Sequence, residues 1–200
     1  MEFPQFNSDK ASSQRTNLYW ALNLYHFVND AIVFLIPTIM ATLYEEFDLS
    51  FIQTSAVLAF NVGATVAFQV LNGYLVDKGK EKQLYFFGLP FMTTSVFLLL
   101  LAKDFPSLLL LATLNGVGLS FVHALTYTIG IKLFPEDKED KQSRMAAFGD
   151  LGKILAISSS AVMLAFNRSK WRIPLFFWGI VAAFILILAT ALLSKFPFDK

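Results

Sequence analysis

Apolar residues fill six long stretches of this chain, and the polar stretches between them are short. The apolar stretches cover residues 18–43, 51–76, 84–102, 108–134, 145–166 and 171–193. A helix needs about 20 apolar residues to cross a hydrocarbon core about 30 Å thick, and a backbone in lipid must satisfy its hydrogen bonds internally. The pattern therefore predicts an all-α integral membrane protein with six transmembrane helices.

The same pattern predicts the domain organisation. Residues 18–194 are expected to form one six-helix transmembrane domain, because no linker or low-complexity stretch divides them. Residues 1–17 and 195–200 are expected to be tails. The first apolar stretch is too long for the hydrophobic region of a cleaved signal peptide, so we expect it to stay in the mature chain.

Lysine and arginine are distributed unevenly between the two ends of the predicted helices. If the N-terminus is cytoplasmic, that side carries Lys10, Arg15, Lys78, Lys80, Lys82, Lys132, Lys138, Lys141, Arg144, Lys195 and Lys200. The other side carries only Lys103, Arg168, Lys170 and Arg172. Because positively charged loops stay in the cytoplasm, we predict a multi-pass protein of the cell membrane with both termini cytoplasmic.

Composition narrows the classes of function. Hydrophobic residues make up 56% of the chain and charged residues 16%, against about a quarter charged in soluble domains, so the main partner is the lipid bilayer. A net charge of +1 provides no basic surface, and no nucleic-acid partner is expected. With no cysteine, thiolate metal sites and cysteine nucleophiles are excluded. We predict neither a cofactor nor a metal site.

Five ionisable residues interrupt the apolar stretches, where charges are expensive and usually functional. They are His26, Asp30, His123, Asp150 and Lys153. At about 1.5 Å of rise per residue, His26 and Lys153 lie roughly 12 Å from the cytoplasmic ends of their helices, and His123 lies roughly 15 Å from its own. We therefore predict that three helices line a common cavity in which Asp30 and Lys153 are counter-ions.

Two asparagines, Asn29 and Asn115, are predicted to line the same cavity, because they lie on the most polar helices. A structural interpretation also fits each of these residues. Asp150 and Lys153 are three residues apart and can neutralise each other on one helical face, and the two histidines can be hydrogen-bonded core residues.

Small and amide side chains indicate how the helices pack. Gly149, Gly152, Ala156 and Ser160 form a small-residue stripe that would allow another helix to approach closely. In the second apolar stretch, amide side chains are expected to form hydrogen bonds between helices rather than to bind substrate. These are Asn61, Gln69 and Asn72.

The turn after the second apolar stretch carries a recognisable motif. Residues 73–82 read Gly-Tyr-Leu-Val-Asp-Lys-Gly-Lys-Glu-Lys, which resembles the Gly-x-Leu-Ala-Asp-Arg-x-Gly-Arg-Lys loop of the major facilitator superfamily. The resemblance implies a gating loop made of Gly73, Asp77, Lys78, Gly79 and Lys80, with Gly79 one place earlier than in the family.

Residues of the first helix point to a branch of the same family. His26-Phe27-Val28-Asn29-Asp30, Pro37 and the segment 46–50 resemble the first helix and its exit in the fosmidomycin-resistance-like branch. The resemblance covers the whole chain but only one half of the family's usual twelve-helix fold.

The resemblance implies a transporter, not an enzyme, that moves a small solute by alternating access. Asp30 would be the candidate site for proton coupling, and Lys153 would hold an anionic group or Asp30 itself. Because a polar wall facing lipid costs several kcal/mol per unsatisfied group, a partner is expected. It would be a second copy, forming a homodimer, or a separately encoded second half.

The sequence leaves two alternative classes of function open and disfavours a third. The chain also fits a truncated product or an accessory subunit without transport activity of its own. Two histidines at matched depth on different helices fit the axial ligands of a b-type haem. An intramembrane hydrolase is disfavoured, because no histidine follows Ser120 on a later helix to act as its base.

Overall fold

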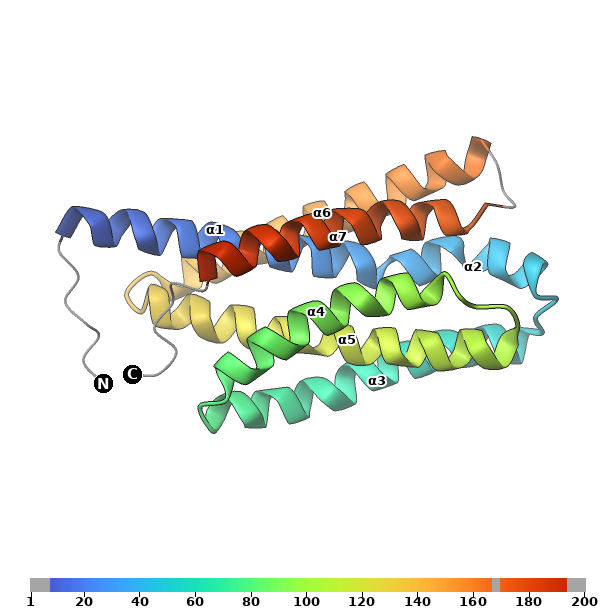
Figure 1. The fold of residues 1–200 in the computed structure, drawn as a ribbon, viewed down its shortest axis with the longest axis horizontal. Coiled ribbons are helices and arrows are strands. Elements are labelled where there is room, and N and C mark those ends of the chain that lie inside the picture. Colours follow the sequence, from blue (N-terminus) through green and yellow to red (C-terminus); the bar gives the residue numbers. More distant parts are fainter. Residues whose placement is uncertain (1–7, 167–169, 194–200) are drawn as a thin grey trace.

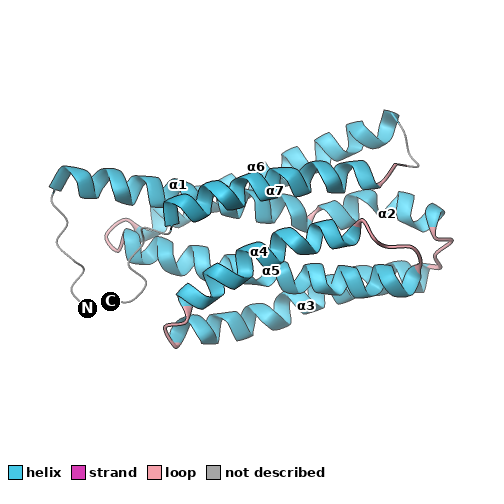
Figure 2. Cartoon of the chain, in the orientation of Figure 1, coloured by secondary structure: helices cyan, strands magenta, loops and turns pink. Residues whose placement is uncertain are grey.

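The computed structural model is an all-helical bundle, described over residues 8–166 and 170–193. In this part of the chain the elements are α1 (Ser8–Val33), α2 (Leu35–Glu46), α3 (Phe51–Asp77), α4 (Glu81–Leu99), α5 (Phe105–Leu133), α6 (Lys138–Phe166) and α7 (Arg172–Leu193). They run back and forth along one axis, joined by short turns (Figures 1 and 2). The turns α3–α4 and α5–α6 lie at the same end as the start of α1 and the end of α7 (Figure 1).

Five helical segments are long and apolar enough to cross a membrane. They are Gln14–Glu46, Phe51–Asp77, Phe105–Leu133, Lys138–Phe166 and Arg172–Leu192. The remaining helix, α4, contains Pro90 within its 19 residues and begins with the polar residues Glu81 and Lys82. The predicted apolar stretches are thus confirmed as spanning candidates for five of six helices, and the sixth stays a prediction.

The first predicted helix differs from the structure because it divides into α1 and α2 at Phe34. Pro37 lies in the first turn of α2, has no backbone N–H and displaces the carbonyl four residues earlier. The chain tightens here, with the Phe34 N–H donating to the carbonyl of Ala31 at 3.3 Å. The two helices still form one continuous apolar segment.

Helix α6 begins at Lys138, about two turns before the predicted apolar start at residue 145. The reason is that apolarity marks the part of a helix in lipid, whereas the helix itself continues through the charged residues that precede it. Arg144 and Asp140 stabilise this extension as an i,i+4 ion pair at 2.9 Å.

Capping residues fix the turns between helices. Ser50 is the N-cap residue of α3 and Asp104 is the N-cap residue of α5. Each forms a reciprocal capping box with the residue three places later. The hydroxyl and backbone N–H of Ser107 donate to the Asp104 carboxylate and lower the pKa of that exposed carboxyl. These caps account for the sharp starts of two helices at the end of the bundle opposite the α3–α4 turn.

Helices α1 and α5 form the centre of the bundle. Helix α5 packs against α3, α4, α1 and α6, while α1 packs against α6, α7 and α5. The outer helices α3 and α6 bury few of their residues. The functional residues predicted on α1, α5 and α6 therefore belong to helices in direct contact.

Candidate functional site

Helix α1 supplies two residues of the candidate site from one face. His26 and Asp30 are four positions apart, so they lie one turn above each other on the same side of the helix. Both residues are buried, at 1% and 4% relative exposure. Nε2 of His26 lies 3.5 Å from Oδ1 of Asp30, which places an imidazole directly over a buried carboxylate.

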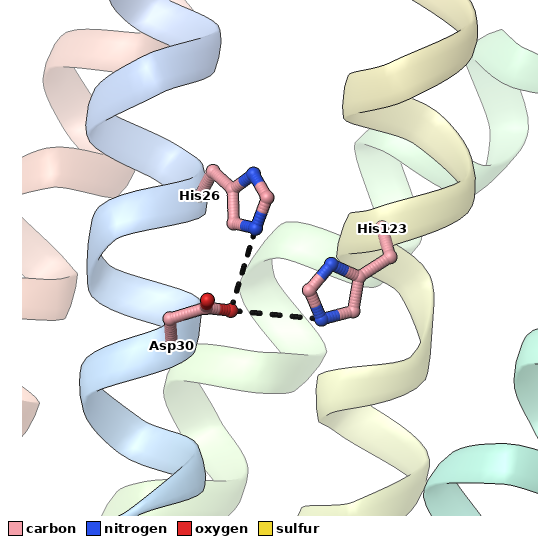
Figure 3. Close-up of side chains that lie close together, drawn as sticks. All are labelled: His26, Asp30 and His123. Carbon is pink, nitrogen blue, oxygen red and sulfur yellow. Dashed lines mark ion pairs between the residues drawn. The ribbon is translucent and has the colours of Figure 1, made fainter. Parts of the chain in front are cut away.

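Helix α5 adds a second imidazole to the same carboxylate oxygen. Nε2 of His123 lies 3.6 Å from Oδ1 of Asp30, and Figure 3 shows both rings converging on Asp30 from two helices. The two imidazole rings meet edge to face with their centroids 4.9 Å apart. Tyr127, one turn further along α5, stacks on His123 with the ring centroids 6.2 Å apart.

Helix α6 contributes a lysine that joins two carboxylates. Nζ of Lys153 lies 3.1 Å from Oδ2 of Asp30 and 2.8 Å from Oδ1 of Asp150. Asp150 is exposed, with its side chain at 67%. The predicted pairing of Asp30 with Lys153 across helices is therefore present, and so is the pairing of Asp150 with Lys153 on one face.

Two glycines allow α6 to approach α1 closely enough for this contact. A methyl group at Gly149 would lie 2.5 Å from Oδ2 of Asp30, and one at Gly152 would lie 2.2 Å from the backbone oxygen of Phe27. Ala156 and Ser160 continue the buried stripe. The first half of the predicted small-residue stripe thus packs against α1, next to Lys153.

Asn29 completes the polar surroundings of Asp30. Its Nδ2 lies 3.2 Å from Oδ1 of Asp30 and 3.3 Å from Nε2 of His123. Two other atoms, Oδ1 of Asn29 and Nδ1 of His26, are buried without a hydrogen-bond partner in the described part of the chain. The cluster therefore contains two buried polar atoms that could still accept or donate a hydrogen bond.

The cluster is closed on one side and open on the other. The side chains of His26 and Asp30 are 2% and 5% exposed, whereas those of His123 and Lys153 are 28% and 32% exposed. With both imidazoles neutral, one lysine stands against two carboxylates, so the cluster behind the open side carries a net negative charge.

Asn115, which the sequence assigned to the same cavity, lies in a separate network about two turns away on α5. Its Nδ2 donates to the Ser95 hydroxyl at 3.1 Å, and its Oδ1 accepts from Asn61 at 3.3 Å. Asn61 also donates to the backbone oxygen of Ala112 at 2.7 Å. These bonds join α3, α4 and α5, so the predicted interhelical role of Asn61 is confirmed.

A second amide of α3 has the same role. Nδ2 of Asn72 donates to the Ser120 hydroxyl at 2.9 Å, and both side chains are buried. The Ser120 hydroxyl also donates to the backbone oxygen of Val117 at 2.6 Å. The bond from Asn72 thus joins α3 to α5, whereas the bond to Val117 stays within α5.

The predicted gating loop forms the turn between α3 and α4. Asp77 is the last residue of α3, and Gly79 adopts a left-handed φ of 72°. The N–H of Gly79 donates to Val76 and that of Lys80 to Leu75, which is the Schellman pattern with glycine at its left-handed position. The early glycine thus ends α3, while Gly73 lies within the helix and Lys78 lies over the Tyr74 ring.

Charged residues at this end of the bundle make contacts that their positions in the sequence do not indicate. Glu81, buried at the start of α4, pairs with Lys132 near the end of α5. Nε of Arg15 in α1 donates to the backbone oxygen of Leu133 at 3.0 Å. The guanidinium group of the same residue lies over the Phe134 ring. A charged residue beside a turn looks like a solvent-exposed one in the sequence, and only the fold shows that it caps a helix end.

The geometry of the two histidines does not fit the b-type haem alternative, but it does fit a small cation. Two imidazoles whose rings meet edge to face at 4.9 Å leave no room for a porphyrin between them, as bis-histidine haem ligation requires. A small cation is different. Ligand atoms of His26, Asp30 and His123 lie within 4.8 Å of one another, a grouping that the sequence analysis did not predict as a metal site.

Comparisons with known proteins agree with the resemblance noted in the sequence. A family model described as Major Facilitator Superfamily matches residues 22–199. The fosmidomycin resistance protein of Escherichia coli (strain K12) is 30% identical over 176 residues, which cover 88% of this chain and 42% of that protein. The chloramphenicol resistance protein CraA of Acinetobacter baumannii is 29% identical over 191 residues, covering 91% and 43%. The chain spans less than half the length of these curated relatives.

Proposed function

The chain belongs to the Major Facilitator Superfamily, and we propose that it acts as one six-helix half of a transporter that moves a small solute by alternating access. The observation that carries this proposal is the buried Asp30, which faces His26 and His123 and pairs with Lys153. A charge within a membrane domain is expensive unless it has a function. Here three helices supply partners for one carboxylate.

Asp30 is the proposed site of proton coupling. A carboxylate whose partners include one lysine and two imidazoles can exchange partners when a proton arrives, because imidazoles gain and lose protons near neutral pH. The groups that face it are His26, His123 and Lys153, with Asp150 behind the lysine. Protonation would weaken the Asp30–Lys153 pair and release α6 from α1.

The solute is proposed to meet the open side of this cluster, where the side chains of His123 and Lys153 are partly exposed. The two relatives are named for resistance to fosmidomycin and to chloramphenicol. These two compounds are therefore the first candidates for transport by this chain, and Lys153 is proposed to hold the Asp30 carboxylate.

The functional assembly is proposed to contain a second six-helix unit, either another copy of this chain or a separate half. Support comes from the half-exposed side chains of His123 and Lys153, which lipid would leave poorly solvated. The excess of lysine and arginine at the end where α3 meets α4 and α5 meets α6 supports cytoplasmic termini in the cell membrane. Transport rather than catalysis is the activity expected of the family.

The test is accumulation of fosmidomycin and chloramphenicol in membrane vesicles under an imposed pH gradient. Losing a charge-assisted hydrogen bond of about 1.5–3 kcal/mol corresponds to roughly 10–100-fold, so Asp30→Asn should lower gradient-driven transport by that factor. Asp140→Asn is the matched control, because that carboxylate is exposed and pairs with Arg144 outside the cluster, and it should retain most of the rate. Unchanged transport and pH dependence in Asp30→Asn would reject the coupling role.

A further inference from the structure

The cluster in Figure 3 has the composition and spacing of a metal site. Nε2 of His26 and Nε2 of His123 both face Oδ1 of Asp30, at 3.5 and 3.6 Å. We propose that these three atoms bind a divalent transition-metal ion, of the class of Zn²⁺, Co²⁺ or Ni²⁺. The proposal concerns equilibrium binding and holds whether or not the chain moves a solute.

Two of the three distances between the proposed ligand atoms fit such an ion, and all three atoms lie within 4.8 Å of one another. Metal bonds of about 2.0–2.1 Å in tetrahedral geometry place neighbouring ligand atoms about 3.3–3.4 Å apart, close to the 3.5 and 3.6 Å observed here. Hydrogen bonds between nitrogen and oxygen are about 2.7–3.2 Å long. Both imidazole nitrogens therefore lie farther from Oδ1 than a hydrogen bond of ordinary length would place them.

The charges around the carboxylate leave that space available. Lys153 contacts the other oxygen, Oδ2, and is shared with Asp150. Among the described residues, Lys153 contacts Oδ2, whereas Oδ1 faces the two imidazoles and the amide of Asn29. With neutral imidazoles the cluster carries one positive and two negative charges, so it favours a cation.

Asn29 can supply a fourth ligand. Its Nδ2 lies 3.3 Å from Nε2 of His123, an arrangement in which that Nε2 presents its lone pair toward the cluster. The carbonyl oxygen of the same amide is buried and unpartnered within the described residues. A half-turn of the amide would bring this oxygen to face the ion. The donor set would then be two imidazoles, a carboxylate and an amide oxygen.

This donor set selects the class of metal. Imidazole nitrogen suits zinc, cobalt, nickel and copper, whereas calcium and magnesium prefer sites made of oxygen alone. The half-exposed His123 gives the ion a route of entry from the open side. Lys153 lies near enough to repel the ion, so the affinity of the natural site is expected to be held down by one positive charge.

The test is a titration of the purified full chain with Co²⁺, followed by its visible absorption and by displacement with Zn²⁺. His26 and His123 are the two histidines among the 200 residues, and there is no cysteine, so imidazole ligation can come only from this cluster. We expect saturable binding at one ion per chain, with X-ray absorption showing two imidazoles on the metal. No saturable binding, or a spectrum without imidazole, overturns the proposal.

Variants separate a metal site from a structural contact. His123→Gln, at a half-exposed position, should weaken Co²⁺ binding at least about tenfold through loss of a ligand. Lys153→Met should strengthen it by about tenfold or more, because a like charge is removed. A merely structural role of the cluster predicts no such opposite effects, and unchanged affinity in either variant contradicts the proposal.

Glu81→Gln provides the matched control. Glu81 is also a buried carboxylate paired with a lysine, Lys132, but it lies at the end of the bundle. Its replacement should leave Co²⁺ affinity unchanged, and an equal loss in this variant would mean that the ion binds elsewhere. Because these measurements need no transport, their failure and a failure of the proposed transport function are distinguishable.

Discussion

Gly152 shows how a single residue sets the position of the functional lysine. A Cβ atom added to Gly152 would lie only 2.2 Å from the backbone oxygen of Phe27, which is too close for two non-bonded atoms. Any larger residue must move α6 away from α1. The neighbouring Lys153 would then leave the 3.1 Å contact with Asp30, so packing and electrostatics depend on the same glycine.

Replacing Gly152 by alanine is therefore expected to destabilise the bundle by about 1–3 kcal/mol through overpacking. The control is Gly63→Ala within α3, where a methyl group meets nothing within 4 Å. Gly63→Ala should be neutral or stabilising by about 0.5–1 kcal/mol, because alanine favours the helix. Thermal unfolding of both variants in one detergent measures the difference. A Gly152→Ala protein as stable as the parent would argue against the close contact of α1 with α6.

Much of the cluster could be predicted at the residue scale, because ionisable side chains are rare in apolar helices and stand out. Their depth along each helix brought His26, His123 and Lys153 to one level, and the structure brings them around Asp30. Depth alone does not give the direction in which a side chain points. The polarity of a helix does not give it either: Asn115 was expected in the cavity because it lies on a polar helix, whereas its side chain bonds to α3 and α4.

At the scale of elements, apolar length predicts spans better than it predicts helices. Residues 18–43 read as one helix, although Pro37 divides it, and α6 continues beyond its apolar part to Lys138. The burial of Glu81 could not be predicted from the sequence, because a charged residue at a turn is usually exposed. In the fold, the start of α4 packs against the end of α5 and buries it.

Helix α4 provides the test at this scale. If it crosses the membrane, the turns at its two ends lie on opposite sides, with Lys80 inside and Lys103 outside. The chain has no cysteine, so Lys80→Cys and Lys103→Cys each introduce one reactive thiol at an exposed position. An impermeant maleimide added to intact cells should label Lys103→Cys and should label Lys80→Cys only after permeabilisation.

Equal labelling of the two variants in intact cells would mean that α4 does not cross the membrane. Labelling of Lys80→Cys alone would invert the proposed orientation. Labelling after permeabilisation serves as the control for accessibility, because both thiols should then react to the same extent.

At the scale of the whole molecule, the bundle has two kinds of outer surface. The surface of α7 is apolar, with Phe184 at 68% exposure. The outer face of α6 also exposes apolar residues such as Ile154, at 60%, but it lies beside the half-exposed Lys153 and the exposed Asp150. Lipid suits the first surface. The second places charges at its centre, and a protein partner would solvate them better.

This difference predicts how lipid reaches the two faces in the assembled protein. A fluorophore on Ile154→Cys should be shielded from quenching by brominated lipids, because a second six-helix unit covers α6. The same fluorophore on Phe184→Cys should be quenched strongly. Native mass measurement on the same preparation should report a complex larger than the 22.4 kDa chain. Equal quenching at both positions, together with the mass of a single chain, would show that α6 faces lipid. That outcome would contradict the proposed second six-helix unit and would favour an accessory protein without transport activity of its own.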